Sequence, residues 1–324
     1  MKVSIIVPTY GSRLDYLADT LRTVKNQNFP IEDYEILVID NNPKSQVTSV
    51  VDKINQEVKE GPIIVRIPEP EIGLSRARNT GALKAHGEVI VYVGDDILAH
   101  PEWLKALVRP FEDARVGCSG GKLIAKWEAP IPEWIGQVSH MALGMLDLGD
   151  QTLELTGQQV WGDNMAVRKT ALLEVGGFNP DIYGYADKNY LWLGGDGEHG
   201  LEEKVYKRNY KFIYEPQAWL YHRVPASRTK EDYFYKRNFV GGIGCSFGQI
   251  RNMPNKNFLS VRLLVQSAYY FLKSGKWFLT RWLDRKNHIR AGTYANFYQA
   301  KAQHQWRVAL NKKLRAYVLQ ESYL

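Results

Sequence analysis

The sequence predicts an α/β fold, in which a doubly wound, mostly parallel sheet is flanked by helices and followed by a C-terminal helical extension. Two patterns in the sequence favour this class, and the composition is compatible with it. Short apolar runs alternate with helical segments through the first 100 residues, as they do in consecutive β-α-β units. The 324 residues are 44% hydrophobic and 24% charged, which is ordinary for a globular protein. Residues 258–323 show mainly helical patterns.

The first part of the chain supplies four predicted strands, and polar residues follow each of them. The expected strands are 2–7, 34–39, 63–67 and 89–93, and the expected helices are 14–26, 45–59 and 74–85. Open α/β sheets bind ligands beyond the carboxyl ends of such strands. A dinucleotide-binding Rossmann domain is not indicated, because the turn after the first strand, PTYGSR, contains a single glycine.

Less regular patterns follow. Strands are expected at 116–124 and 158–167, a helix at 169–175, and a helix end, a strand and an exposed edge within 206–221. The predicted organisation is a domain of residues 1–245, with a nucleotide-binding half (1–110) and an acceptor or catalytic half (111–245). A basic, mainly helical extension, 246–324, completes the chain.

Two adjacent carboxylates, Asp95 and Asp96, follow the predicted strand 89–93. Neighbouring like charges raise each other's pKa unless a cation or a donor compensates for them. Carboxylates and phosphate oxygens together form a natural shell for Mg²⁺ or Mn²⁺. The same pair could instead form a turn that caps the next helix, which has Pro101 in its first turn. The two residues alone leave both interpretations open.

Six ordered motifs resemble those of the family 2 glycosyltransferases, enzymes of the GT-A fold, over residues 1–245. In chain order they are VSIIVPTYG, VID, GLSRARNTGALKAHGEVIVYVGDD, WGDNMAVRKTALLEVGGF, GGDGEHGLEEKV and YHR. Each motif alone is weakly specific, but six in this order indicate the family. The resemblance implies an inverting, metal-dependent glycosyltransferase of polysaccharide or glycan biosynthesis. It would move a sugar from a nucleotide-diphosphate donor, expected to be a UDP-sugar, to a hydroxyl acceptor.

The resemblance places the donor nucleotide across the strand ends. Pro8, Thr9 and Tyr10 would line the base pocket, and Asp40 would accept a hydrogen bond from the base or the ribose. Arg78 would contact the diphosphate, because a guanidinium matches its oxygens. The residues by themselves are also compatible with a simple turn at Thr9 and Tyr10 and a helix cap at Asp40.

The family's metal motif is a run of three acidic positions, and Gly94 replaces the first acid here. By resemblance, Asp96 would bind the metal, and Asp95 would bind the ribose or support the metal site. His222, in YHR, matches a family histidine that can complete the metal shell, although a histidine after an apolar strand can also be structural. The expected cofactor is Mn²⁺ or Mg²⁺, and an imidazole ligand favours Mn²⁺.

The resemblance also assigns catalytic and sugar-binding residues. Asp196 would be the general base that deprotonates the acceptor hydroxyl, with Glu198 as the substitute. The match is partial, because a glycine replaces the acid that precedes this aspartate in the family. Trp161, Asp163 and Asn164 would contact the donor or acceptor sugar. Taken as residues alone, Asp196 could also be a helix-capping aspartate in a polar loop.

Positive charge is concentrated at the end of the chain, whose net charge is +7. From Lys256 onward there are 13 Lys and Arg residues and two acids. Residues 258–283 mix Leu, Phe, Tyr and Trp with Lys and Arg and contain no acid. This composition suits either an amphipathic helix on an anionic membrane or a helix that docks on the catalytic domain. No nucleic-acid-binding motif accompanies the charge.

The expected partners are a nucleotide-sugar donor, a glycan or lipid-linked acceptor and an anionic membrane surface, with no nucleic acid. Two cysteines without metal-ligand spacing, no signal-peptide pattern and no apolar run of membrane-spanning length predict a cytoplasmic protein, peripheral at the inner membrane face. Two other classes compete with this hypothesis: a nucleotide-sugar-binding protein that has lost turnover, and a peripheral membrane scaffold.

Overall fold

Four parallel strands form the N-terminal part of the sheet, at the positions that the alternating pattern predicts. The computed structural model describes residues 2–42, 44–156, 160–179, 196–320 and 322–324. The strands are β1 (Val3–Thr9), β2 (Tyr34–Asp40), β3 (Ile64–Pro68) and β4 (Val89–Val93). They pair in the order β3-β2-β1-β4, and the three pairings are parallel.

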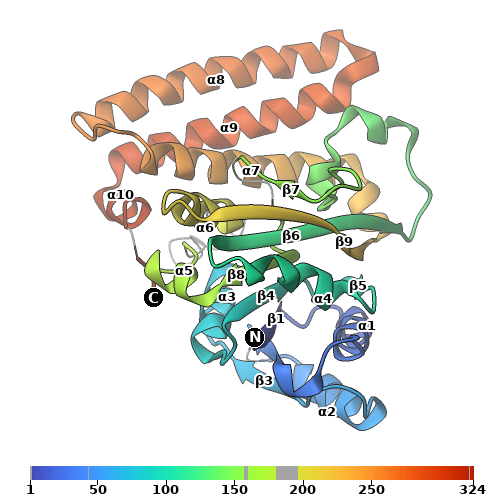
Figure 1. Cartoon of the computed structure of the whole chain (residues 1–324). Coiled ribbons are helices and arrows are strands. Elements are labelled where there is room, and N and C mark those ends of the chain that lie inside the picture. Colours follow the sequence, from blue (N-terminus) through green and yellow to red (C-terminus); the bar gives the residue numbers. More distant parts are fainter. Residues whose placement is uncertain (1, 43, 157–159, 180–195, 321) are drawn as a thin grey trace.

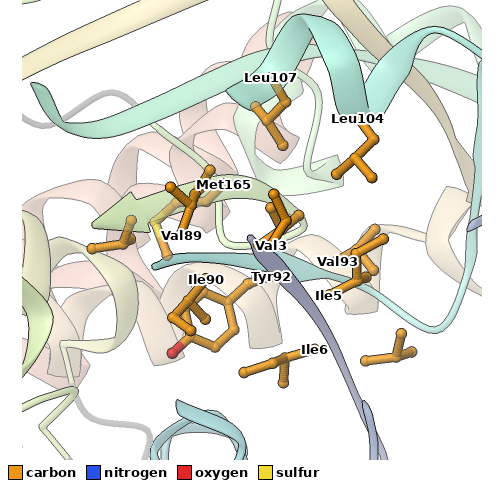
Figure 2. Packing of buried hydrophobic residues seen from close by; sticks show 14 of the residues in the cluster. Val3, Ile5, Ile6, Val89, Ile90, Tyr92, Val93, Leu104, Leu107 and Met165 are labelled. Carbon is orange, nitrogen blue, oxygen red and sulfur yellow. The ribbon is translucent and has the colours of Figure 1, made fainter. Parts of the chain in front are cut away.

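Helices α1 (Leu14–Lys25), α2 (Val47–Glu57) and α3 (Leu74–Lys84) connect these strands. In α1 the buried Leu17, Leu21 and Val24 have the spacing that places them on one helical face. Figure 2 shows the packing around β1 and β4, which includes Ile5, Ile90, Tyr92, Met165 of β8, and Leu104 and Leu107 of α4 (Trp103–Val108). Every residue of β4 is buried, which explains its uninterrupted apolar run.

The remaining strands interrupt the parallel order. β8 (Asn164–Arg168) is antiparallel to β4 and to β6 (Val116–Trp127), whereas β6 and β9 (Lys211–Val224) are parallel. β5 (Ile97–Ala99) and β7 (Leu153–Glu154) are antiparallel to β9. The strand predicted at 158–167 is observed from residue 164, and residues 157–159 lie outside the described part. The exposed edge predicted within 206–221 is wrong, because β9 lies between β6 and β5.

Strand register determines which residues meet at the end of β4. Asn164 of β8 pairs with Val93 of β4, and His222 of β9 pairs with Ile97 of β5. The beginning of β8 and the late part of β9 therefore lie beside the turn that carries Asp95 and Asp96. Segments far apart in the sequence form one site in this way.

Most of the later chain is helical, as predicted. The helices are α5 (Lys169–Glu174), α6 (Gly197–Tyr206), α7 (Glu231–Arg251), α8 (Leu259–Leu283), α9 (His288–Leu310) and α10 (Lys312–Val318). Short 3₁₀ helices occur at η1 (Ile31–Asp33), η2 (Arg109–Glu112), η3 (Glu133–Gln137), η4 (His140–Leu143), η6 (Ala226–Thr229) and η7 (Arg285–Asn287). Figure 1 shows α7, α9 and α8 as successive layers on one side of β6 and β9, with α8 outermost. Residue 245, the predicted domain boundary, lies within α7, and the division into domains stays a prediction.

None of the described helices combines the length and the apolar character that a membrane span requires. The 25 residues of α8 would be long enough, but its lysines and arginines make it too polar.

Candidate active site

A cavity of about 320 Å³ lies beyond the carboxyl ends of β1 and β4. Its lining includes the predicted site residues Pro8, Asp95, Asp96, Asp163 and His222. Three arginines that were not predicted also line it: Arg13, Arg228 and Arg237. The cavity therefore combines carboxylates, an imidazole and guanidinium groups at the sheet edge where α/β folds bind ligands.

Asp96 is at the centre of a charged cluster. Its Oδ2 atom is 3.0 Å from Arg13 Nη2 and 2.8 Å from Arg228 Nη2. Its Oδ1 atom is 3.4 Å from His222 Nε2, which accepts a hydrogen bond from Arg228 Nη1 at 2.8 Å. Burial would raise the pKa of Asp96, but His222, Arg228 and Arg13 outweigh burial and hold this pKa well below its usual range. Asp96 is therefore a carboxylate at neutral pH.

Asp95 points to the neighbouring strand. Thr9, the last residue of β1, donates a hydrogen bond from Oγ1 to Asp95 Oδ2 at 2.6 Å. Burial raises the pKa of Asp95 to about 6, against the hydrogen bond from Thr9. The predicted donor-site residues Thr9 and Asp95 thus contact each other directly.

Gly94 leaves space that a carboxylate from another strand uses. A Cβ atom at Gly94 would lie 3.1 Å from Asp96 Oδ1 and 3.1 Å from Asp163 Oδ1. Asp163 reaches this place because it immediately precedes β8, which runs antiparallel to β4. Burial is the main cause that raises the pKa of Asp163. The acidic motif has only two carboxylates in the sequence, but in the folded chain Asp163 brings a third carboxylate next to them.

The pair Asp96 and His222 has the chemistry of a divalent-cation site. In the described ranges, no group of three or more His, Cys, Asp or Glu residues forms a preformed metal site. Asp96 Oδ1 and His222 Nε2 nevertheless face one cavity and offer oxygen and imidazole ligands. His222 Nδ1 is buried and has no hydrogen-bond partner among the described residues. The pair fits Mn²⁺ or Mg²⁺ if phosphate oxygens and water fill the other positions.

The predicted base pocket lies at the ends of β1 and β2, where Thr9 pairs with Asp40. Asp40 is buried, accepts a hydrogen bond from Ser45 Oγ at 2.6 Å and forms an ion pair with Arg66 at 2.7 Å. Tyr10 is 49% exposed, so its ring is available for stacking. Arg66 was not predicted as a site residue, and it places a donor next to the Asp40 acceptor.

Arg78 is buried beneath Gly162, where a Cβ atom would clash with the guanidinium. Its Nη1 atom is 3.1 Å from Glu198 Oε2. Burial opposes ionisation of Glu198, but the charges of Arg78 and then His199 outweigh it and lower the pKa of Glu198 to about 2. The charge of Glu198 also acts on Asp163, which lines the cavity. The predicted contact of Arg78 with diphosphate stays a prediction.

Asp196 has a different environment. Its two carboxylate oxygens each accept a hydrogen bond from Asn179 Nδ2 at 2.8 Å, and Oδ2 is 3.1 Å from Arg251 Nη1. Burial raises the pKa of Asp196 to about 6, against the charge of Arg251. Asp196 occupies the N-cap position of α6 without a side-chain capping bond, and Arg251 is the last residue of α7. The structure therefore shows Asp196 connecting α6 and α7.

The other predicted sugar contacts separate into two kinds. Asn164 is fully buried: its Oδ1 accepts from Trp103 Nε1 at 2.7 Å, and its Nδ2 donates to the carbonyl of Ala218 at 2.8 Å. The prediction that Asn164 contacts sugar is corrected, because its amide joins strands inside the sheet. Trp161 is half-buried, with its ring 5.5 Å from that of His199, and its sugar contact stays a prediction.

Solved structures define the class of this fold. The mannosyltransferase PcManGT of Pyrobaculum calidifontis, solved with GDP-Man and Mn²⁺, aligns with a TM-score of 0.56 over 98% of this chain and 85% of its own, at 17% identity. Residues 1–349 of Staphylococcus aureus TarS, solved with UDP, align with a TM-score of 0.52 over 93% of this chain and 90% of that one, at 15% identity. The fold is that of the GT-A glycosyltransferases.

Sequence relatives define the family. The model of "Glycosyl transferase family 2" matches residues 4–176. The glucosyl-dolichyl phosphate glucuronosyltransferase of Haloferax volcanii is 25% identical over 247 residues, which are 75% of each chain. The GalNAc(5)-diNAcBac-PP-undecaprenol beta-1,3-glucosyltransferase of Campylobacter jejuni is 26% identical over 203 residues, 59% of each chain. This chain belongs to glycosyltransferase family 2 and is a glycosyltransferase, which confirms the family predicted from the six motifs.

Proposed function

We propose that this glycosyltransferase transfers a sugar from a UDP-sugar to a hydroxyl group of a lipid-linked glycan, with inversion at the anomeric carbon. The observation that carries the proposal is the cavity at the strand ends, where Asp96, His222 and three arginines converge. The structural neighbours support a nucleotide-sugar donor and a divalent cation, because PcManGT was solved with GDP-Man and Mn²⁺ and TarS with UDP.

The donor nucleotide would lie across the ends of β1, β2 and β4. The exposed ring of Tyr10 would stack on the base. Asp40 would accept from the base or ribose, and Arg66, its ion-pair partner, could donate to a base carbonyl. Asp95, which Thr9 orients, would accept from a ribose hydroxyl.

The cation and the arginines would stabilise the leaving diphosphate together. Asp96 and His222 would hold Mn²⁺ or Mg²⁺, which when bound offsets the negative charge of the departing diphosphate. Arg13 and Arg228 already bind the Asp96 carboxylate from the cavity side, and guanidinium groups also match phosphate oxygens. Asp163 lies beside Gly94, the position of the missing acid, and would add a third negative charge near the cation.

For the general base we propose Glu198, with Asp196 in a positioning role. Glu198 is ionised at neutral pH, and its charge acts on cavity-lining Asp163. Its pKa of about 2 makes it a weak base while Arg78 is its partner, and it becomes a stronger base if Arg78 binds the donor diphosphate as predicted. The acceptor hydroxyl would give its proton to Glu198 as its oxygen forms a bond to the anomeric carbon. The bond from that carbon to the diphosphate oxygen breaks in the same step, and the diphosphate leaves with the electron pair. Asp196 is already bound to Asn179 and Arg251.

The names of two relatives support a lipid-linked acceptor, because they specify a dolichyl phosphate in one case and a PP-undecaprenol in the other. We propose such an acceptor for this chain, and action at the cytoplasmic face of a membrane, where a lipid-linked acceptor could be reached. Trp161, near the start of β8, would contact the sugar of donor or acceptor.

Thermal unfolding with a panel of nucleoside diphosphates, with and without Mn²⁺, tests the donor site. A ligand that binds only the native state raises its stability, by about 2.7 kcal/mol at 100 times its Kd. We expect a rise in Tm that requires both UDP and Mn²⁺ and is smaller with GDP. Absence of any rise would overturn the proposal. Release of UDP from a UDP-sugar then distinguishes an enzyme from a protein that only binds the donor.

A further inference from the structure

Helix α8 is the outermost layer of the helical extension (Figure 1) and has one buried face. Its buried residues Leu259, Leu263, Ser267 and Tyr270 recur every three or four positions. The Ser267 hydroxyl donates to the carbonyl of Ala302 in α9 at 2.8 Å. The helix is therefore fixed on α9 in one rotational orientation.

The opposite face of α8 is a row of exposed apolar side chains. The row, called here the outer face, consists of Phe258, Val261, Val265, Tyr269, Leu272, Leu279, Trp282 and Leu283. Leu272 is 76% exposed and Leu283 is 85% exposed, so no described residue covers them. Monomeric proteins rarely expose contiguous apolar surface of this kind without a partner.

Positive charge accompanies this face. Residues 258–310, from the start of the row to the end of α9, contain nine Lys and Arg residues and a single acid, Asp284. Lys276 is exposed within α8, and Arg285, Lys286 and Arg290 are exposed where the chain turns into α9. A surface that is both apolar and cationic matches acyl chains bordered by anionic headgroups.

We propose that the outer face of α8 docks on an anionic lipid surface, with the helix axis in the plane of the membrane. The leucines, valines and Phe258 would enter the boundary between headgroups and acyl chains. Tyr269 and Trp282 suit that boundary because their rings are amphipathic, and Lys276 would extend its ammonium to the phosphates. This inference concerns a surface remote from the reaction and does not depend on the proposed donor or base.

Charge favours lipid over a second copy of the chain as the occupant. Two outer faces packed on each other would bring their cations together, and α8 contains no acid to pair with them. An anionic headgroup layer neutralises the same cations, and each basic residue near such a surface adds to the binding.

Sedimentation of the full chain with vesicles tests the proposal. Binding is expected to vesicles of phosphatidylcholine with added phosphatidylglycerol, and it should weaken as salt rises. The double variant Leu272→Glu/Leu279→Glu should reduce the partition coefficient about tenfold or more. Ile63→Glu/Leu83→Glu is the matched control, because these residues of the nucleotide-binding half are 75% and 56% exposed. It should bind as the wild type does.

Three outcomes would overturn the proposal. They are no binding to anionic vesicles, equal binding to phosphatidylcholine alone, and equal losses in the two double variants. If light scattering finds a dimer that only Leu272→Glu/Leu279→Glu dissociates, and vesicles are not bound, the face belongs to a second copy. A cooperative thermal unfolding transition of each variant without ligand shows that the variants are folded. Stabilisation by UDP and Mn²⁺, measured in parallel, reports on the proposed function separately, so a failure of one proposal is distinguished from a failure of the other.

Discussion

Two charged regions of the molecule differ in how their carboxylates are neutralised. At the cavity, Asp96 alone contacts two arginines and His222. At the start of α6, each carboxylate has its own arginine: Arg78 for Glu198 and Arg251 for Asp196. Asp96 therefore shares several cationic partners, whereas Asp196 and Glu198 have one arginine each; with Asp95 and Asp163, the cavity lining as a whole has three carboxylates and three arginines.

This difference separates a cluster whose ion-pair partners are shared from one in which Asp196 and Glu198 each have their own. Arg13 and Arg228 share one carboxylate, so they can turn to the oxygens of an entering diphosphate if a cation takes their place on Asp96, and ligand binding should act first on the cavity region. In the α6 region the pKa values diverge, with Asp196 raised to about 6 and Glu198 lowered to about 2. Two carboxylates in different environments can take different roles, and substitution can test each one.

The largest effect is expected from Glu198→Gln, which would show that the α6 region is also catalytic. The substitution removes the proton acceptor and retains the size of the side chain. We expect kcat to fall by about 10²–10⁴, while stabilisation by UDP and Mn²⁺ is retained. Glu203→Gln, on the same helix, is the control. Normal turnover of Glu198→Gln would return the base assignment to Asp196.

Asp96→Asn should act on both binding and turnover. It leaves Arg13 and Arg228 without their shared carboxylate and removes an anionic ligand of the proposed cation. We expect transfer to fall by about 10²–10³ and Mn²⁺ to lose its effect on the Tm measured with UDP. Asp113→Asn, in which the lost partner is exposed Arg115, should change neither value. A Mn²⁺-dependent Tm shift that survived in Asp96→Asn would exclude Asp96 as a ligand.

Much of the first half of the fold could be predicted from sequence, because its determinants are local. The apolar runs of β1, β2 and β4 and the helical spacing of α1 were sufficient. No helix was predicted over 231–245, the larger part of α7, which contains the glycine-rich run GGIGCSFG. One of these glycines, Gly242, lies so close to the carbonyl of Phe297 in α9 that a Cβ atom would clash. The packing of α9 therefore requires a residue that lowers helix propensity.

The site could be predicted in part for the same reason. Asp95, Asp96 and His222 belong to motifs, and they meet because the two aspartates follow β4 while His222 lies in the late part of β9, paired with β5. The proximity of Asp163 to Gly94 depends on the antiparallel register of β8, which is a tertiary property. Arg228 lies six residues after His222, which is only a weak indication that it belongs to the site. Nothing in this spacing indicates an ion pair with Asp96. Asn164 was misassigned because its neighbours in the motif are polar, whereas the sheet buries it.

The role of the Asp163 carboxylate in the cavity region can be tested by removing it and placing a carboxylate at position 94 instead. Asp163→Asn should weaken Mn²⁺-dependent binding of UDP about 10–100-fold, the usual cost of losing a group that supports a metal ligand. Adding Gly94→Asp to this variant returns a carboxylate to nearly the same space and should recover part of the affinity. Calorimetric titration of UDP with Mn²⁺ measures both. If the double variant bound more weakly than Asp163→Asn, the two positions would not be equivalent.

The smallest effect on catalysis is expected from Asp196→Asn, which tests whether this carboxylate is structural. The variant should retain kcat within a few-fold, because Asp196 is bound to Asn179 and Arg251.

The signature of Asp196→Asn should instead be the pH dependence of stability. A carboxyl whose folded pKa is raised binds its proton more tightly in the native state, so the wild type loses stability as pH rises from about 4 to 6. The difference between the ordinary pKa of 3.8 and the folded pKa of about 6 corresponds to a loss of about 3 kcal/mol, at most, in the free energy of unfolding. Asparagine does not titrate, so the free energy of unfolding of the variant should fall less across this interval in urea titrations. Equal slopes in the two proteins, together with a large loss of kcat, would instead assign Asp196 to the reaction.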